Sequence, residues 1–271
     1  MTTVEVVRDG PVALIRMNRP EVHNALNPTM LTTLLETVKA TSADTSVRAI
    51  VLTGGQRAFS TGEDLIEAAQ LDEAAFRNQI GQFQELATAL RFAPQPVVAA
   101  VGGHAIGGGL EIAVNCDARI AAANARFACP EVEWSLTLSN GSSVLLRELI
   151  GEGWTRELLL FGATFDAETA LRIGLVTRVV AESELESKAL EMAHIAASYG
   201  QAAIRLTKQL VNADPRPWDS TLEAETQAVV EGFNDHTARQ RLQRFADRKR
   251  EPLVQPAGET DRPRPTPPGS A

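Results

Sequence analysis

Helix-length segments alternate with short apolar strands along most of this chain, and this alternation is its strongest constraint on fold. Helical periodicity over about 28–41 precedes an apolar strand at 47–52, and a second helical stretch over about 72–92 precedes a strand at 97–101. A further strand is expected at 118–121. Helices that alternate with short apolar strands are typical of an α/β fold.

The C-terminal quarter departs from this pattern. From about 182 to 250 the sequence is almost entirely helical, with a break at Ala213-Asp-Pro215. We expect these helices to pack on their own core or on a neighbouring subunit. The last twenty-one residues contain six of the fourteen prolines, which predicts a disordered tail. The expected division is therefore a core at 1–200, a helical region at 201–250 and a Pro-rich tail at 251–271.

Composition excludes several classes of function. The chain has 271 residues, of which 44% are hydrophobic, enough to bury a large core. Its formal net charge of −8 argues against nucleic-acid binding. No apolar stretch approaches the ~20 residues of a membrane helix, and no signal peptide is recognisable, so we expect a cytoplasmic protein without a membrane partner. Two cysteines without a CxxC pair predict buried thiols and no metal site.

The run Gly107-Gly108-Gly109 lies between a strand and a segment that is apolar on nearly every face. The segment is expected to be a buried helix, whose N-terminus presents unpaired N–H groups to a ligand. Such donors suit a developing oxyanion. Glu111 is the anomaly, because a carboxylate among apolar neighbours is costly to bury. A structural alternative is a first-turn glutamate that only complements the helix dipole.

Two other segments carry candidate groups. In Arg57-Ala-Phe-Ser-Thr-Gly-Glu-Asp-Leu65, the N–H of Glu63 is a possible second oxyanion donor, and the simpler reading is a turn with Asp64 capping a helix. In Phe127-Ala-Cys-Pro-Glu131, the proline favours extended backbone before Glu131, although most Pro-Glu pairs begin helices. Two carboxylates facing one substrate can divide acid and base roles. The standard phosphate-binding glycine loops and the GxSxG and HExxH motifs are absent.

Together these segments resemble the crotonase superfamily, also called the enoyl-CoA hydratase/isomerase family, from about residue 4 to 252. The matching motifs are Asn18-Arg-Pro20, Asn24-Ala-Leu26, 47–54, 58–65, 102–116, 127–131 and 245–249. The resemblance implies an α/β fold: a spiral of ββα repeats with a helical C-terminal region that forms a trimer, or a hexamer from two trimers. It also implies an acyl-CoA thioester substrate, with coenzyme A as part of the substrate and no separate cofactor.

The resemblance also implies roles for individual residues. The thioester oxygen would lie between the N–H groups of Glu63 and Gly108, and Glu111 and Glu131 would be the catalytic acids of a hydratase. Further contacts to substrate or coenzyme A are expected from Arg57, Asp64, Leu65, Gly107, Ser139, Phe245 and Arg248. Three positions depart from the family pattern: Glu63 replaces a common alanine, Cys129 a frequent glutamine, and Ser139 a glycine whose N–H contacts the active site.

Three functions follow from these residues. The first is an enoyl-CoA hydratase, favoured because both glutamates are present. The second is an enoyl-CoA isomerase or another crotonase-type reaction, which typically does not need both acids. The third is a catalytically silent acyl-CoA binder or scaffold. A glycosidase also uses paired carboxylates, but aromatic residues make up only 5% of the chain, which leaves few surfaces for sugar stacking.

Overall fold

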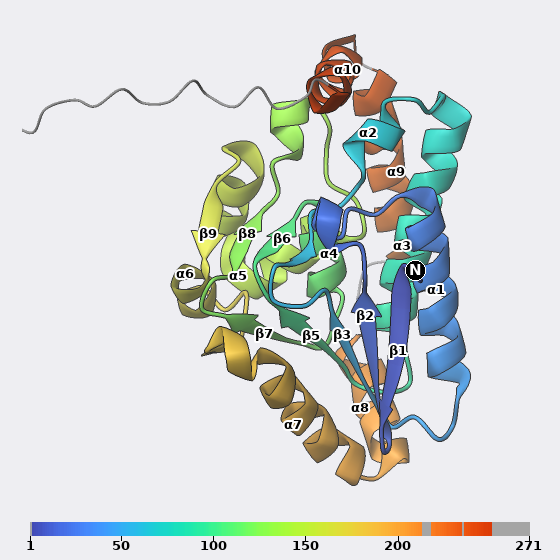
Figure 1. The fold of residues 1–271 in the computed structure, drawn as a ribbon, viewed down its shortest axis with the longest axis vertical. Coiled ribbons are helices and arrows are strands. Elements are labelled where there is room, and N and C mark those ends of the chain that lie inside the picture. The colour runs from blue at the N-terminus through green and yellow to red at the C-terminus, as the bar shows by residue number, and fades with distance from the viewer. Residues whose placement is uncertain (1, 213–217, 235, 251–271) are drawn as a thin grey trace, which may run out of the picture.

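The computed structural model describes residues 2–212, 218–234 and 236–250. The predicted break at 213–215 and the predicted tail at 251–271 lie outside these residues. Within them, two sheets are surrounded by helices, and the chain winds repeatedly between the sheets (Figure 1). The α/β prediction is confirmed.

The larger sheet has six strands in the order β1-β2-β3-β5-β7-β10. Its strands are β1 (Val4–Asp9), β2 (Val12–Met17), β3 (Ala49–Thr53), β5 (Val97–Val101), β7 (Ala118–Ala122) and β10 (Arg178–Val180). The first pair is antiparallel, and all later neighbours are parallel. Parallel strands need crossover connections, which explains the helices between them.

The smaller sheet has the order β4-β6-β8-β9. Its strands are β4 (Ala58–Ser60), β6 (His104–Ile106), β8 (Arg126–Ala128) and β9 (Thr164–Asp166). Each of β3, β5 and β7 in the large sheet is followed by the next strand along the chain in the small sheet. After β4 and after β6, helical segments lead the chain back to the large sheet. After β8, helical segments lead first to β9 in the small sheet and then to β10 in the large sheet. This is the predicted spiral of ββα turns.

Helices cover both faces of the large sheet. One face packs on α7 (Leu185–Ser198), through small residues such as Ala189 and Ala193. The other packs on the main core with α1 (Pro28–Ala43), α3 (Glu73–Arg91) and α4 (Gly108–Val114). Successive side chains of a strand point to opposite faces of the sheet. In β2, Val12 and Leu14 therefore pack on the side of α7, whereas Ala13 and Ile15 pack in the main core.

Local signals set several boundaries close to the prediction. Asn27 caps α1 by accepting a hydrogen bond from the N–H of Met30 (2.9 Å), and Pro28 occupies the first turn.

The remaining helices of the first 200 residues are α2 (Leu65–Ala68), α5 (Ser142–Leu160) and α6 (Ala167–Arg172). Short 3-10 turns occur at Pro20–Val22, Glu131–Trp134 and Glu182–Glu184. Cys116 and Cys129 are free and buried.

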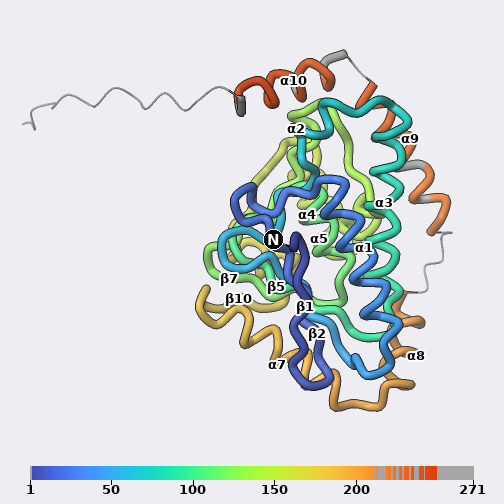
Figure 2. Tube along the Cα trace, turned by 45° about the vertical axis from the view of Figure 1, so that its right-hand side comes forward, coloured from blue at the N-terminus to red at the C-terminus, as the bar shows by residue number. Residues whose placement is uncertain are grey.

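The C-terminal region is helical, as predicted, and folds back on the core. It consists of α8 (Gln201–Val211), α9 (Trp218–Asn234) and α10 (His236–Arg250). Figure 2 shows α9 running beside α3, while α10 lies over α2. Phe76 of α3 stacks on Phe233 of α9 with ring centroids 3.6 Å apart. Of the helices described, none is both long and apolar enough to cross a membrane.

Candidate active site

The glycine run forms the start of α4 at the centre of the molecule. Gly107 joins β6 to the helix with a φ of 54°, in the region that favours glycine. A Cβ at this position would lie 2.8 Å from Oε1 of Glu131, so the missing side chain also makes room for that carboxyl. Gly108 is the first residue of the helix, and its N–H therefore has no acceptor within it.

A second main-chain donor lies against this helix start. Glu63 forms a single parallel bridge with Leu26, in which Leu26 bonds the backbone of Gly62 and Asp64 (2.7 and 3.2 Å). This pairing leaves the N–H of Glu63 unused. A Cβ on Gly62 would lie only 2.7 Å from the nitrogen of Gly108, so the two segments are in close contact. Glu63 and Gly108 line the same cavity.

Glu111 is buried, with 3% of its surface exposed, and is firmly held. One carboxylate oxygen accepts a hydrogen bond from the N–H of Ser139 (2.7 Å). The other accepts from the Ser139 hydroxyl (3.1 Å) and from the Asn140 side-chain amide (2.9 Å). Three donors stabilise the carboxylate form and fix its orientation. The alternative of a glutamate that only complements the helix dipole does not account for these contacts.

Glu131 has the opposite environment. It opens the 3-10 turn Glu131–Trp134, as the structural alternative had proposed, and it also lines the cavity. Its Oε2 is buried, and no residue in the described ranges hydrogen bonds to it. Burial raises the pKa of Glu131 to about 7, although its own backbone N–H opposes the shift. The group can therefore carry a proton near neutral pH.

The Glu63 side chain adds a third carboxyl. Burial raises its pKa to about 8, with further contributions from the negative charges of Asp64 and Glu131. Asp64, next to it, is engaged differently: its Oδ2 lies 3.3 Å from Nη1 of Arg19. Asp64 occupies the N-cap position of α2, as the simpler reading expected, but its side chain makes no capping hydrogen bond and pairs with Arg19 instead.

These groups surround a cavity of about 510 Å³. Its apolar wall comes from α3, through Phe76, Ile80 and Phe83, and from the C-terminal helices, through Val229 and Phe245. Lysine and arginine are absent from the described residues that line it. The cavity thus combines an apolar wall, two main-chain donors and several carboxyls, which suits a neutral carbonyl compound with an apolar portion.

Most of the predicted site residues are brought together here. The cavity is lined by Glu63, Asp64, Leu65, Gly107, Gly108, Glu111, Glu131, Ser139 and Phe245. Arg57 and Arg248 are exposed and lie outside the cavity wall. Their predicted contacts to coenzyme A remain predictions. In the described part of the chain, no group of three His, Cys, Asp or Glu residues is arranged to hold a metal ion.

Sequence reasoning missed several residues of the site. Asn140, which holds Glu111, lies next to the predicted Ser139 but was not itself predicted as a site residue. Its φ of 59° and the following Gly141 mark a tight turn, and the Asn-Gly pair was a signal that could have found it. The apolar lining from α3 and α9 has no local signature, because its residues follow ordinary helical core spacing.

The fold and this cavity define an enzyme class in which main-chain N–H groups meet a carbonyl oxygen beside acid–base carboxyls. Within that class, the chain belongs to the enoyl-CoA hydratase/isomerase family, whose model matches residues 8–255. It is 34% identical over 252 residues to a short-chain-enoyl-CoA hydratase of Clostridium acetobutylicum, covering 92% of this chain and 97% of that one.

Other comparisons agree. A crotonyl-CoA hydratase of Syntrophomonas wolfei is 36% identical over 206 residues, which cover 76% of this chain and 79% of that protein. The crystal structure of an enoyl-CoA hydratase/isomerase from Mycobacterium paratuberculosis superimposes with a TM-score of 0.84 at 27% identity, covering 90% of this chain and 98% of that one. The similarity therefore extends through both the spiral core and the C-terminal helices.

Proposed function

We propose that this protein is an enoyl-CoA hydratase that adds water across the 2,3 double bond of a 2-enoyl-CoA. The observation that carries the proposal is the presence of two dissimilar glutamates, Glu111 and Glu131, in one cavity with the main-chain donors of Glu63 and Gly108. Relatives named as hydratases over most of the chain support the same reaction.

The thioester oxygen binds between the N–H groups of Glu63 and Gly108. As water attacks C3, electron density moves through C2 to this oxygen, and the fixed donors stabilise the resulting enolate. Removal of one such donor typically costs about 3–4 kcal/mol in the barrier. The Gly108 donor belongs to a helix N-terminus, whose partial positive charge adds to the effect.

The two glutamates handle the protons. Glu111, oriented by hydrogen bonds from Ser139 and Asn140, accepts the proton of the attacking water. Glu131, whose pKa is raised to about 7, delivers a proton to C2. The different surroundings of the two groups therefore suit them to opposite roles. No separate cofactor takes part, because coenzyme A enters as part of the substrate.

The product of but-2-enoyl-CoA tests the proposal. Hydration yields a 3-hydroxyacyl-CoA whose mass exceeds that of the substrate by one water, which mass spectrometry detects directly. If a 3-enoyl-CoA is converted to its 2-enoyl isomer while no water is added to any 2-enoyl-CoA, the protein is an isomerase and the proposal is wrong.

For the assembly, we infer a homotrimer or a dimer of trimers. Large apolar side chains are exposed on and after α5 and on α6, with Phe161 80% exposed and Leu160 59% exposed. Exposed apolar groups of this size favour burial in an interface. Light scattering on the purified protein should give three or six times the mass of one chain, and a monomer would contradict the inference.

A further inference from the structure

The side chain of Glu63 has no part in the reaction described above, in which only its main-chain N–H is used. Yet this residue lines the cavity, and its Oε1 is buried without a hydrogen-bond partner among the residues described. A buried polar atom without a partner is rare in folded proteins and calls for an explanation.

Two neighbouring carboxyls have partners of their own. Asp64 is paired with Arg19, and Glu111 is held by Ser139 and Asn140. Among the described carboxyls that line the cavity, Glu63 and Glu131 each have a buried oxygen without a hydrogen-bond partner, and only Glu131 is used in the reaction proposed above. Because the pKa of Glu63 is raised to about 8, it holds a proton at neutral pH, and a protonated carboxyl can both donate and accept a hydrogen bond.

The chemistry of the cavity selects the ligand group. A purely hydrocarbon acyl chain would cover Glu63 and leave its carboxyl without a partner. A carboxylate on the acyl chain would meet Glu111 and Glu131, with no lysine or arginine among the described lining residues to offset the repulsion. An uncharged oxygen function, such as a hydroxyl or a carbonyl, satisfies Glu63 without adding charge.

The position of Glu63 locates that oxygen. The preceding residue, Gly62, packs against the start of α4, where the thioester is held under the proposed function, and the Glu63 carboxyl lies close enough to Glu131 for their charges to interact. The acyl carbons nearest to Glu63 are therefore those around the double bond. We propose that Glu63 is a specificity-determining residue, which selects 2-enoyl-CoA substrates carrying an uncharged oxygen substituent close to that double bond. This inference rests on the proposed function.

Matched substrate pairs test the proposal. Hydration of 4-hydroxybut-2-enoyl-CoA is compared with that of but-2-enoyl-CoA, and 5-hydroxypent-2-enoyl-CoA with pent-2-enoyl-CoA. We expect kcat/KM to be at least ~10-fold higher for the hydroxylated member of at least one pair, because a site that hydrogen bonds a substrate group discriminates against analogues that lack it. Equal or lower values for both hydroxylated members would overturn the proposal.

Two variants separate hydrogen bonding from other effects. Glu63→Gln keeps the size and both hydrogen-bonding functions, and we expect it to retain the preference within about three-fold. Glu63→Leu keeps the main-chain N–H but removes the polar group, and we expect the preference to disappear or reverse. A Glu63→Leu variant that loses activity on both members of a pair equally would indicate a role in proton transfer or folding, and would contradict the proposal.

Binding measurements distinguish failure of this inference from failure of the proposed function. Calorimetry with saturated analogues, 4-hydroxybutanoyl-CoA and butanoyl-CoA, needs no turnover. Tighter binding of the hydroxylated analogue by about 10-fold in wild type and in Glu63→Gln, without hydration of any enoyl-CoA, would support the specificity while disproving the hydratase. Hydration together with equal affinities and equal kcat/KM values would leave the hydratase intact and disprove the role of Glu63.

Discussion

Glu111 and Glu131 are the same residue type in the same cavity, but their carboxyls have different surroundings. Glu111 accepts three hydrogen bonds, whereas Oε2 of Glu131 is buried without a partner in the described part of the chain. Donors around a carboxyl favour its ionised form, and burial without donors favours its protonated form. The proposed division between base and acid rests on these surroundings.

Substitution of either glutamate by glutamine tests this division. Glu111→Gln and Glu131→Gln should each lower kcat by at least ~100-fold, because each removes a group that transfers a proton in the transition state. Steady-state hydration of but-2-enoyl-CoA measures the effect. Glu36→Gln, on the exposed side of α1, is the control and should behave as wild type. Folded variants of both cavity residues with wild-type turnover would disprove the assignment.

Glu63 makes stability depend on pH. Its folded-state pKa is about 8, against an ordinary value of 4.5. Between these values the native state keeps a proton that the unfolded chain releases, so the free energy of unfolding falls as pH rises through this window. Glu131, with a pKa of about 7, acts in the same direction.

We therefore expect Glu63→Gln to melt at nearly the wild-type temperature at a pH of about 4.5 and a few degrees higher at a pH of about 8.5. At the higher pH the wild type contains a charged, buried carboxylate that the glutamine variant lacks. Calorimetric Tm values across this range measure the difference. A constant offset at all pH values would contradict the raised pKa.

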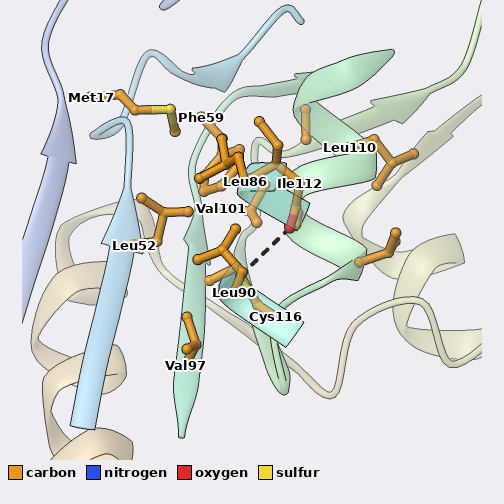
Figure 3. Close-up of a cluster of buried hydrophobic side chains, with 14 of the residues drawn as sticks. Met17, Leu52, Phe59, Leu86, Leu90, Val97, Val101, Leu110, Ile112 and Cys116 are labelled. Carbon is orange, nitrogen blue, oxygen red and sulfur yellow. Dashed lines mark hydrogen bonds between the residues drawn. The ribbon is translucent and has the colours of Figure 1, made fainter. Parts of the chain in front are cut away.

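At the scale of elements, α4 is unusual in being short and buried. Its seven residues are too few for a stable isolated helix, so tertiary contacts must hold it in place. Arg119 bonds the carbonyl oxygens of Ala113 (3.4 Å) and Cys116 (2.8 Å) at its C-terminal end. Leu110 and Ile112 insert into the apolar core shown in Figure 3. The donor at Gly108 is fixed through these contacts.

Gly109→Ala should displace this helix. A Cβ at position 109 would lie 2.3 Å from the carbonyl oxygen of Ser60. Because this oxygen belongs to the main chain, the clash can be relieved only if one of the two backbone segments moves. We expect a loss of about 1–3 kcal/mol in the free energy of unfolding. Movement of the donor at Gly108 should also lower kcat by roughly 100-fold, because catalysis is sensitive to misplacement on the ångström scale.

Gly81→Ala provides the matched control, because Gly81 lies within α3 and a Cβ there meets nothing within 4 Å. The added methyl restricts the unfolded chain and should stabilise the protein by up to ~1 kcal/mol without affecting kcat. Chemical denaturation gives both stabilities. Equal effects of the two substitutions would show that close packing at Gly109 does not position α4.

At the scale of the whole molecule, the C-terminal helices are joined to the core by a buried cation. Lys208 of α8 donates to the carbonyl oxygens of Leu90 (3.2 Å) and Gln95 (3.0 Å) and to Oδ2 of Asp117 (2.7 Å). Asp117 also accepts from the N–H of Val97, at the start of β5. One network thus links α8, the end of α3 and the large sheet.

Lys208→Met should be strongly destabilising. It keeps most of the side-chain volume but removes a buried cation that donates to two carbonyl oxygens and to the partly exposed carboxylate of Asp117, a loss that typically costs about 3 kcal/mol. For a chain of this size, that corresponds to a Tm roughly 10 °C lower. Lys188→Met removes an exposed lysine paired with Glu191 and should leave the Tm unchanged. Similar Tm values for both variants would show that the Lys208 network does not stabilise the fold.

The sequence alone determined features that depend on neighbouring residues. The alternation of strands and helices, the Asn27 cap, the glycines at the start of α4 and the anomalous Glu111 are all local, because hydrogen bonding and side-chain periodicity act over a few positions. The pairing of Glu111 with Glu131 and of Glu63 with Gly108 came from family resemblance, and the cavity lining is consistent with both.

Only the tertiary structure decided how the carboxyls differ. The three donors to Glu111 come from a loop 28 or 29 residues away, and the cavity wall includes Val229 and Phe245 from the far end of the chain. The raised pKa values of Glu63 and Glu131 arise from burial by all these elements together. Desolvation and contacts between distant segments exist only once the chain has folded, so no local pattern encodes them.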